Sequence, residues 1–276
     1  MLIAESVSVR YDKQTIVKDF SFTAASGEIV SIIGPNGSGK STLLKAVAKN
    51  IPYFQGNVFL EGKDIRSLRP KQVAQKMCMV SQKNSAPMDM TVIDLVTYGR
   101  HPHKKWYETI HDHDRKIIDW ALERTYLTAY KHRTVASLSG GESQRAWIAM
   151  ALAQQPKVLL LDEPTTYLDI SHQHEVLELV RELNQDMGMT VLMVLHDLNQ
   201  AARYSDQIIV VQEGRRVMCG SPGCVMTTDM IRDVYHMHAE VEYVHTETSP
   251  RVHLLCTARD NNGTCIRKTM HQRMDD

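Results

Sequence analysis

A glycine-rich segment near residue 40 combines residue types that can hold a phosphate group. Gly34, Gly39, Lys40 and Ser41 have the spacing GxxxxGKS, in which glycines let consecutive backbone N–H groups form a concave nest for an anion. Lys40 would reach the β- and γ-phosphates of a nucleotide, and the Ser41 hydroxyl would bind Mg²⁺. The alternative is a glycine turn that carries a lysine by chance. The candidate nucleotide-binding residues here are Gly34, Pro35, Asn36, Gly37, Ser38, Gly39, Lys40, Ser41 and Thr42.

Two acidic residues follow a short apolar run, Val158 to Leu161, which is typical of a buried strand. Ligands gather at the carboxyl ends of parallel strands, so Asp162 and Glu163 would lie beside the phosphate-binding segment. Asp162 would hold Mg²⁺, and Glu163 would orient and deprotonate the attacking water. Two solvated carboxylates are the alternative, but the matching phosphate-binding segment favours the catalytic interpretation.

Three further side chains are candidates for the same site. His196 follows the apolar run Val191 to Leu195, and its imidazole would hydrogen-bond the γ-phosphate or the water. A lone histidine after a strand is more often structural, but this one ends a second buried strand. Gln82, at the end of a third expected strand, offers an amide for Mg²⁺ and the water. Tyr11 would stack on adenine; a tyrosine of the hydrophobic core is the alternative.

A second helix start has features of an anion-binding site but no role beside the first one. Ser139 begins a helix with Glu142 three residues later, and Pro156 ends that helix. A hydroxyl, the glycines Gly140 and Gly141, and free N–H groups at the helix start allow close approach of an anion. Two such devices on one chain are explained if the second completes the site of a partner chain.

The elements that position these residues alternate between strands and helices, which indicates a mostly parallel core sheet. Its expected strands are Glu28 to Ile33, Met77 to Val80, Val158 to Leu161 and Thr190 to Leu195. The first thirty residues alternate apolar and polar residues, as half-buried antiparallel strands do. Residues 83–156 have a helical pattern, and Val241, Tyr243, Val252 and Leu254 are expected to form a terminal strand pair. We therefore predict an α/β fold with an antiparallel β subdomain and an inserted α-helical subdomain.

The composition excludes several function classes. The chain has 276 residues, with 32 Lys and Arg against 32 Asp and Glu, so the basic surplus of a non-specific nucleic-acid binder is missing and we expect no nucleic-acid partner. The sequence contains no apolar run long enough for a bilayer and no signal-peptide pattern, so a membrane part would come from another chain. Five scattered cysteines argue against disulfides or a zinc site: Cys78, Cys219, Cys224, Cys256 and Cys265.

The ordered set GPNGSGKST, Gln82, LSGGE, LLLDEP, Tyr167-Leu168-Asp169 and His196 resembles that of the ATP-binding cassette (ABC) ATPases, which have a P-loop NTPase fold. The resemblance covers residues 1–230, with the helical subdomain at about 83–156, and leaves residues 231–276 as a C-terminal extension. It implies ATP and Mg²⁺ as cofactors and a head-to-tail homodimer with two ATP molecules at its interface. Each ATP would be held by residues 34–42, Asp162, Glu163 and His196 of one chain, and by Ser139, Gly140 and Gly141 of the other.

Two more residues take their interpretation from this resemblance. Asp169 would help to couple the two nucleotide sites. Glu142 stands where the commonest family signature has glutamine, but importers also use glutamate there, and an acidic residue suits a helix N-terminus. Gln82 and the helical region would carry the signal to a membrane partner.

Finer similarity concerns the cargo. The segments Tyr98 to His103, Gln144 to Ala153, Thr165 to Gln173 and Leu195 to Asn199 resemble those of ferric-siderophore importers. This resemblance implies a separate ATPase subunit, peripheral at the cytoplasmic face of the cell membrane, with integral membrane permease subunits and, indirectly, an extracytoplasmic substrate-binding protein. Cobalamin and haem importers share much of the pattern, so they remain alternatives.

Two other interpretations concern function outside transport and a metal site. Cassette ATPases of DNA repair and ribosomes typically carry a coiled-coil insertion or a second cassette, and this sequence has neither. The two HxH pairs, His101 with His103 and His111 with His113, suggest metal sensing. Their spacing defines no ligand geometry, so a polar surface loop that touches a permease is the favoured interpretation.

Overall fold

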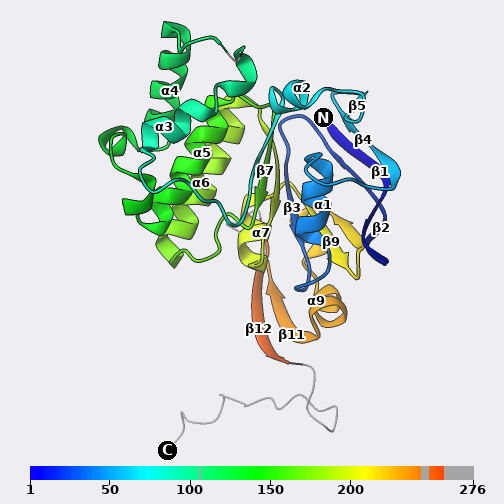
Figure 1. Cartoon of the computed structure of the whole chain (residues 1–276). Helices are drawn as coiled ribbons and strands as arrows, with labels where there is room; N and C mark the ends of the chain where they lie inside the picture. Colours follow the sequence, from blue (N-terminus) through cyan, green and yellow to red (C-terminus); the bar gives the residue numbers. More distant parts are fainter. Residues whose placement is uncertain (106, 244–248, 258–276) are drawn as a thin grey trace, which may run out of the picture.

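The computed structural model describes residues 1–105, 107–243 and 249–257, and a six-stranded sheet lies at its centre (Figure 1). In spatial order its strands are β10 (Arg215–Gly220), β9 (Gln207–Gln212), β3 (Ile29–Ile33), β8 (Thr190–Val194), β7 (Val158–Asp162) and β6 (Met77–Val80). All neighbours are parallel except β10, which is antiparallel to β9. β3, β7 and β8 are buried along their whole length, because helices cover both faces of a parallel sheet.

A second, antiparallel sheet lies beside the first one. Its order is β2 (Gln14–Ala24), β1 (Leu2–Tyr11), β4 (Gln55–Leu60) and β5 (Lys63–Asp64). Helix α1 (Lys40–Val47) contacts strands of both sheets, and the short helix α2 (Pro70–Ala74) leads to β6. One hydrophobic cluster joins both sheets and α1, with Phe20, Ile32, Leu43 and Leu160 fully buried in it. The predicted antiparallel β subdomain is present.

The predicted helical insertion forms a separate layer on one side of the sheet (Figure 1). It contains α3 (Val92–Tyr98), α4 (Asp112–Arg124), α5 (Gly140–Ala153) and the 3-10 turns His101–His103, Thr128–Tyr130 and Val135–Ser137. Helix α6 (Ile170–Met187) packs against α5. The predicted apolar face of α4, with Ile117 and Leu122, is buried. Thr91 and Asp94 form the expected capping box of α3.

The end of the described chain packs back on the sheet. It contains α7 (Leu198–Tyr204), α8 (Pro222–Val225), α9 (Thr228–Tyr235), β11 (Met237–Glu242) and β12 (Arg251–Thr257). β11 and β12 form the expected antiparallel pair, with Val241 opposite Val252. The predicted domain boundary at residue 230 falls inside α9, and the division into a cassette and an extension stays a prediction. Extension residues 244–248 and 258–276, including Cys265, lie outside the described residues.

No helix within the described ranges is long and apolar enough to cross a membrane.

Candidate active site

The phosphate-binding segment connects β3 to α1 and depends on its glycines. Gly34 follows β3 with a φ of 149°, and a Cβ there would lie 2.0 Å from the Val211 carbonyl oxygen. Gly39 caps α1 in the left-handed region, with a φ of 101°. Because glycine has no Cβ, Gly34 and Gly39 can adopt these backbone angles although other backbone atoms lie close to them. The two glycines therefore fix the curvature of the loop between β3 and α1, which ends at the first turn of α1.

Lys40 is folded back on this loop. Its Nζ donates to the carbonyl oxygens of Gly34 at 2.8 Å and Pro35 at 2.9 Å, and the residue is 5% exposed. Burial lowers the pKa of Lys40, while the charges of Glu163 and Asp162 oppose that shift. A phosphate is a stronger acceptor for an ammonium group than a neutral carbonyl is, so a nucleotide would draw Lys40 away from the loop.

Ser41 and Asp162 form the part of the site that could hold a divalent cation. The Ser41 hydroxyl donates to Asp162 Oδ1 at 2.7 Å, and Asp162, at the end of β7, is 3% exposed. Burial raises the pKa of Asp162, and the hydrogen bond from Ser41 opposes this. A buried carboxylate without a paired cation costs free energy that a bound ion would recover. Hydroxyl and carboxylate oxygens are ligands that Mg²⁺ uses, so the pair fits that ion.

Glu163 lies where three neighbouring strand ends meet. Its carboxylate accepts hydrogen bonds from Gln82 Nε2 and from Thr166 Oγ1 at 3.1 Å, and its Oε1 lies 2.6 Å from His196 Nε2. Gln82, Glu163 and His196 follow β6, β7 and β8, which are adjacent, so the parallel sheet brings them together as predicted. Glu163 has a φ of 53°, a conformation that a glutamate rarely adopts. These contacts fix the orientation of the Glu163 carboxylate at the carboxyl end of β7.

Tyr11 lies at the end of β1, opposite Gln14 in the β1–β2 turn, and is 49% exposed. The core alternative for Tyr11 is therefore wrong. The same hairpin reaches the phosphate-binding loop, since a Cβ on Gly39 would lie 3.1 Å from the Ile16 carbonyl oxygen. Stacking of Tyr11 on adenine stays a prediction that this placement permits.

We call the second helix start, residues Ser139 to Glu142, the signature loop. Its polar groups bond to each other. Ser139 Oγ accepts from Glu142 N at 3.3 Å, and Glu142 Oε2 accepts from Ser139 N at 2.8 Å. Those contacts lower the pKa of Glu142. Within the described part of the chain, no hydrogen bond or ion pair joins this loop to residues 34–42. The two helix starts are therefore not joined by a direct hydrogen bond or ion pair in the described part of the chain.

The sequence reasoning missed two side chains at the phosphate-binding site. Thr166 supports Glu163 and is not distinguished from other loop threonines by any pattern. Tyr235 ends α9, an element that the weak pattern after Asp229 did not predict. Its hydroxyl accepts a hydrogen bond from the Gly34 backbone, and burial raises the pKa of Tyr235. Only the packing of α9 on the sheet brings Tyr235 there.

The histidine-rich loop has ordinary structural contacts. His103 Nε2 lies 2.7 Å from the Gln154 carbonyl oxygen, and the His101 ring is tilted against Tyr98. His111 begins α4. Across residues 1–105, 107–243 and 249–257, no group of three or more His, Cys, Asp or Glu side chains could hold a metal ion.

Comparison with known proteins places the chain in a family. The family model described as "ABC transporter" matches residues 17–166, from β2 through the strand that ends in Asp162 and its following loop. The chain belongs to the ABC transporter family. The chain is an ATP-binding cassette ATPase, and both helix starts fall within the matched residues.

Two curated relatives of this cassette come from importers. The chain is 44% identical over 241 residues to the petrobactin import ATP-binding protein FpuC of Bacillus anthracis, a match that covers 87% of this chain and 89% of the relative. It is 45% identical over 240 residues to the iron(3+)-hydroxamate import ATP-binding protein FhuC of Bacillus subtilis (strain 168), with the same coverage of both chains.

A solved structure resembles the cassette in fold. It is the dimeric post-hydrolysis form of the ATP-binding cassette MJ0796 bound to ADP and phosphate. The TM-score is 0.69 at 27% identity, and the match covers 80% of this chain and 98% of that chain. The ABC ATPase fold predicted from the sequence is confirmed.

Proposed function

We propose that this cassette is the ATPase subunit of an importer for a ferric siderophore, and that two copies enclose ATP between them. The observation that carries the proposal is the separation of the two helix starts. Lys40, Asp162 and Glu163 lie together at the phosphate-binding loop, whereas among the described residues no hydrogen bond or ion pair joins the signature loop to residues 34–42. A second chain placed head to tail would bring a signature loop over each nucleotide.

Lys40, Ser41 and Asp162 would bind the nucleotide on one side. Lys40 would exchange the Gly34 and Pro35 carbonyls for the β- and γ-phosphates, with the α1 start behind them. Ser41 and Asp162 would hold Mg²⁺, which neutralises charge that develops on the phosphate oxygens. Asp162 would then be the paired carboxylate that its burial demands.

Glu163 would act as the general base. A water oxygen forms a bond to the γ-phosphorus, the bond between that phosphorus and the bridging oxygen breaks, and the water proton goes to the Glu163 carboxylate. His196, Gln82 and Thr166 already bind both carboxylate oxygens, so they orient the base before ATP arrives. His196, with 41% of its side chain exposed, can also turn toward the γ-phosphate.

The partner chain would contribute Ser139, Gly140 and Gly141 to the far side of the nucleotide, with Glu142 behind them. Their exposed N–H groups and the Ser139 hydroxyl suit a γ-phosphate that approaches from another molecule. Asp169, 65% exposed at the start of α6, would contact the opposite chain and couple the two sites. ATP would then bind the two copies together, and hydrolysis would release them.

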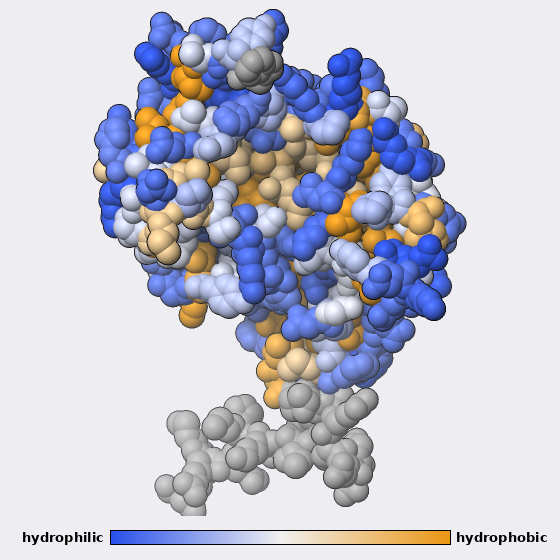
Figure 2. All heavy atoms as spheres, viewed as in Figure 1, coloured by the Kyte–Doolittle hydropathy of each residue, from blue (hydrophilic) through white to orange (hydrophobic). Residues whose placement is uncertain are grey.

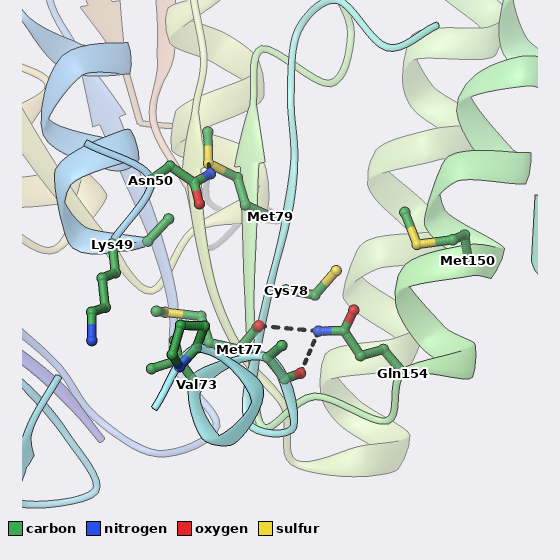
Figure 3. A pocket seen from close by; sticks show the side chains of 11 residues that line it. Lys49, Asn50, Val73, Met77, Cys78, Met79, Met150 and Gln154 are labelled. Atoms are coloured by element: carbon green, nitrogen blue, oxygen red, sulfur yellow. Dashed lines mark hydrogen bonds between the residues drawn. The ribbon is translucent and has the colours of Figure 1, made fainter. Parts of the chain in front are cut away.

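A groove between the helical layer and the two sheets is the proposed contact for the permease. Its lining comes from the end of α1, from α2, from β6 and from α5, and it encloses about 330 Å³ (Figure 3). Met77, Met79 and Met150 make it apolar, and Figure 2 shows the moderately hydrophobic hollow on the face of the molecule. β6 leads to Gln82, and Gln82 donates a hydrogen bond to Glu163, so a permease segment in the groove would act on the strand that positions Gln82 beside Glu163. The cassette would therefore be peripheral at the cytoplasmic face of the cell membrane.

The cargo is inferred from the relatives, because the cassette itself would not touch it. Proteins named for petrobactin import and iron(3+)-hydroxamate import match over 87% of this chain at 44% and 45% identity. The segments that resemble those of siderophore importers lie at and after the end of α3, in α5, at the start of α6 with the loop before it, and between β8 and the start of α7. A binding protein outside the membrane would deliver the siderophore to the permease.

The test is uptake of radiolabelled ferric siderophores by cells that lack this chain. Complementation with the wild type should restore uptake of at least one hydroxamate or catecholate complex, and complementation with Glu163→Gln should not. Restoration by both would contradict ATP-driven import. If no iron complex depends on the chain while cobalamin or haem does, the importer assignment stands and the cargo assignment is wrong.

A further inference from the structure

The start of α6 and the start of α5 meet at one side chain, His172. This histidine is in the third position of α6 and lies 31 residues after Gly141 in the sequence (172 − 141). A Cβ built on Gly141 would lie 2.5 Å from His172 Cδ2 and 2.8 Å from its Cγ. The imidazole therefore covers the second glycine of the signature loop and leaves no room there for any other residue.

The same imidazole also holds Asp169. Its Nδ1 lies 2.7 Å from Asp169 Oδ1, and the His172 backbone N–H donates to that oxygen at 2.9 Å. Because the carboxylate can only accept, Nδ1 carries the proton in this contact. Ser171 Oγ lies 3.2 Å from the same oxygen and is a third donor. Oδ2 of Asp169 is left for another partner.

Neighbouring contacts also join the starts of α5 and α6. Leu168 Cδ2 would lie 3.2 Å from a Cβ on Gly140, and one turn later Arg145 pairs with Glu175 at 2.7 Å. The side chain of His172 is 34% exposed, so it is at the surface where the two helix starts emerge. The imidazole of His172 thus contacts both Asp169 and the glycines of the signature loop, which lie in different parts of the sequence.

We propose that His172 is a positioning residue that joins Asp169 to the signature loop, so that the two reach the partner's nucleotide as one unit. The proposal rests on the proposed function, because it requires that the signature loop and Asp169 act on the opposite chain. Without the imidazole, the Asp169 side chain loses a charge-assisted contact and Gly141 loses its support, while the phosphate-binding loop keeps all of its contacts.

The first test measures the steady-state ATPase activity and single-chain ATP binding of the full-length protein. His172→Ala should lower kcat by about tenfold, the range expected from loss of one hydrogen bond to a charged group. The affinity of the single chain for a fluorescent ATP analogue should not change. His172→Asn keeps a donor at the δ position, and it should recover most of the lost kcat.

The control is His174→Ala. His174 is on the same helix but bonds Tyr204, so this variant should keep the wild-type kcat. A wild-type kcat in His172→Ala would overturn the proposal. Equal losses in His172→Ala and His172→Asn would also overturn it, since the imidazole would then matter only by its volume.

A second test uses the close approach of the two residues. Gly141→Ala should lower kcat strongly in the wild-type background, because the added methyl group meets the imidazole. In the His172→Ala background the same change should cost little more, since the space is free. Likewise, Asp169→Asn and His172→Ala should not be additive. Full additivity of both pairs would contradict a shared unit.

Failure of the proposed function is distinguished by a measurement made first. Size-exclusion chromatography of Glu163→Gln with ATP should show the dimer. If no dimer forms and wild-type turnover does not depend on cassette concentration, action on an opposite chain is wrong altogether. If the dimer forms and His172→Ala behaves as wild type, only the role of His172 is wrong.

Discussion

The phosphate-binding loop and the signature loop both use the start of a helix, but they are built in opposite ways. At the first, Lys40 and Asp162 are buried almost completely, and their charges are held by short polar contacts inside one chain. At the second, Ser139 and Glu142 satisfy each other at the surface. This contrast agrees with the proposed division of roles, in which the first loop binds the nucleotide within one chain and the second adds to a nucleotide held by the partner chain.

The acidic residues of the two loops show the same contrast. Burial raises the pKa of Asp162, whereas hydrogen bonds from Ser139 lower the pKa of Glu142. A raised pKa marks a carboxylate that awaits a positive partner, and a lowered one marks a carboxylate that already has its donors. The proposed catalytic side of the site thus contains a carboxylate that burial disfavours in its charged form, and the side proposed to act on the other chain contains a carboxylate that already accepts hydrogen bonds.

The largest effect should come from Glu163→Gln. An amide cannot accept the water proton, so we expect kcat for ATP hydrolysis to fall by roughly a thousandfold. ATP binding by the single chain should be retained, because Lys40, Ser41 and Asp162 are unchanged. Phosphate release and a filter-binding assay would measure the two quantities. Normal turnover in this variant would show that Glu163 is not the base.

Ser139→Ala should affect the other half of the site. We expect about a tenfold loss of kcat, since one donor to the partner's phosphate is removed, and no loss of single-chain ATP binding. The variant also loses a helix cap, worth about 1 kcal/mol of stability. Thr91→Ala is the matched control, because Thr91 caps α3 through the same kind of box with Asp94. It should lose similar stability and keep its kcat. Loss of ATP binding by Ser139→Ala monomers would contradict action on the opposite chain.

The difference between the loops also explains what the sequence could predict. Gln82, Glu163 and His196 follow three apolar strands, and parallel neighbours bring such ends together, so local patterns were enough to predict that these candidate catalytic residues lie close to one another. The capping box of Ser139 and Glu142 spans four residues and was equally visible. The capping box depends on residues close in sequence, and the cluster of strand ends depends on the general geometry of parallel sheets, so both could be predicted.

The contacts that the sequence did not reveal join distant elements. The packing of His172 on Gly141 depends on how α6 lies against α5, and the contact of Tyr235 with Gly34 depends on how α9 returns to the sheet. Neither residue has a pattern of its own, because a histidine in a polar helix turn and a tyrosine after a weak helix are common. The strand order of the sheet likewise follows from crossovers that single-sequence periodicity does not encode.

Asp162→Asn should separate stability from activity. The raised pKa means that the folded chain favours the protonated form, so that contribution to stability is present below the unfolded pKa of Asp162 and lost as the pH rises through its folded pKa. Near pH 7 the neutral amide should therefore stabilise the nucleotide-free chain, by on the order of 1 kcal/mol, while Mg-ATP hydrolysis is lost. Thermal unfolding without nucleotide would measure the first effect. A lower melting temperature for the variant would contradict the stored destabilisation.

The smallest effect concerns Glu142, and it should have the opposite sign. Its lowered pKa means that the carboxylate stabilises the folded chain above the ordinary value of 4.5, and that this contribution is lost as the pH falls from there through the folded pKa. Glu142→Gln should therefore cost about 0.5 kcal/mol near pH 7, the scale of a charge at a helix N-terminus, and nothing well below pH 4. Urea unfolding at the two pH values gives the comparison, and kcat should stay close to wild type because the glutamine amide oxygen can still accept from Ser139 N. If Glu142→Gln instead stabilised the chain near neutral pH, Glu142 would be an unsatisfied charge like Asp162, and the signature loop could no longer be regarded as complete before its partner arrives.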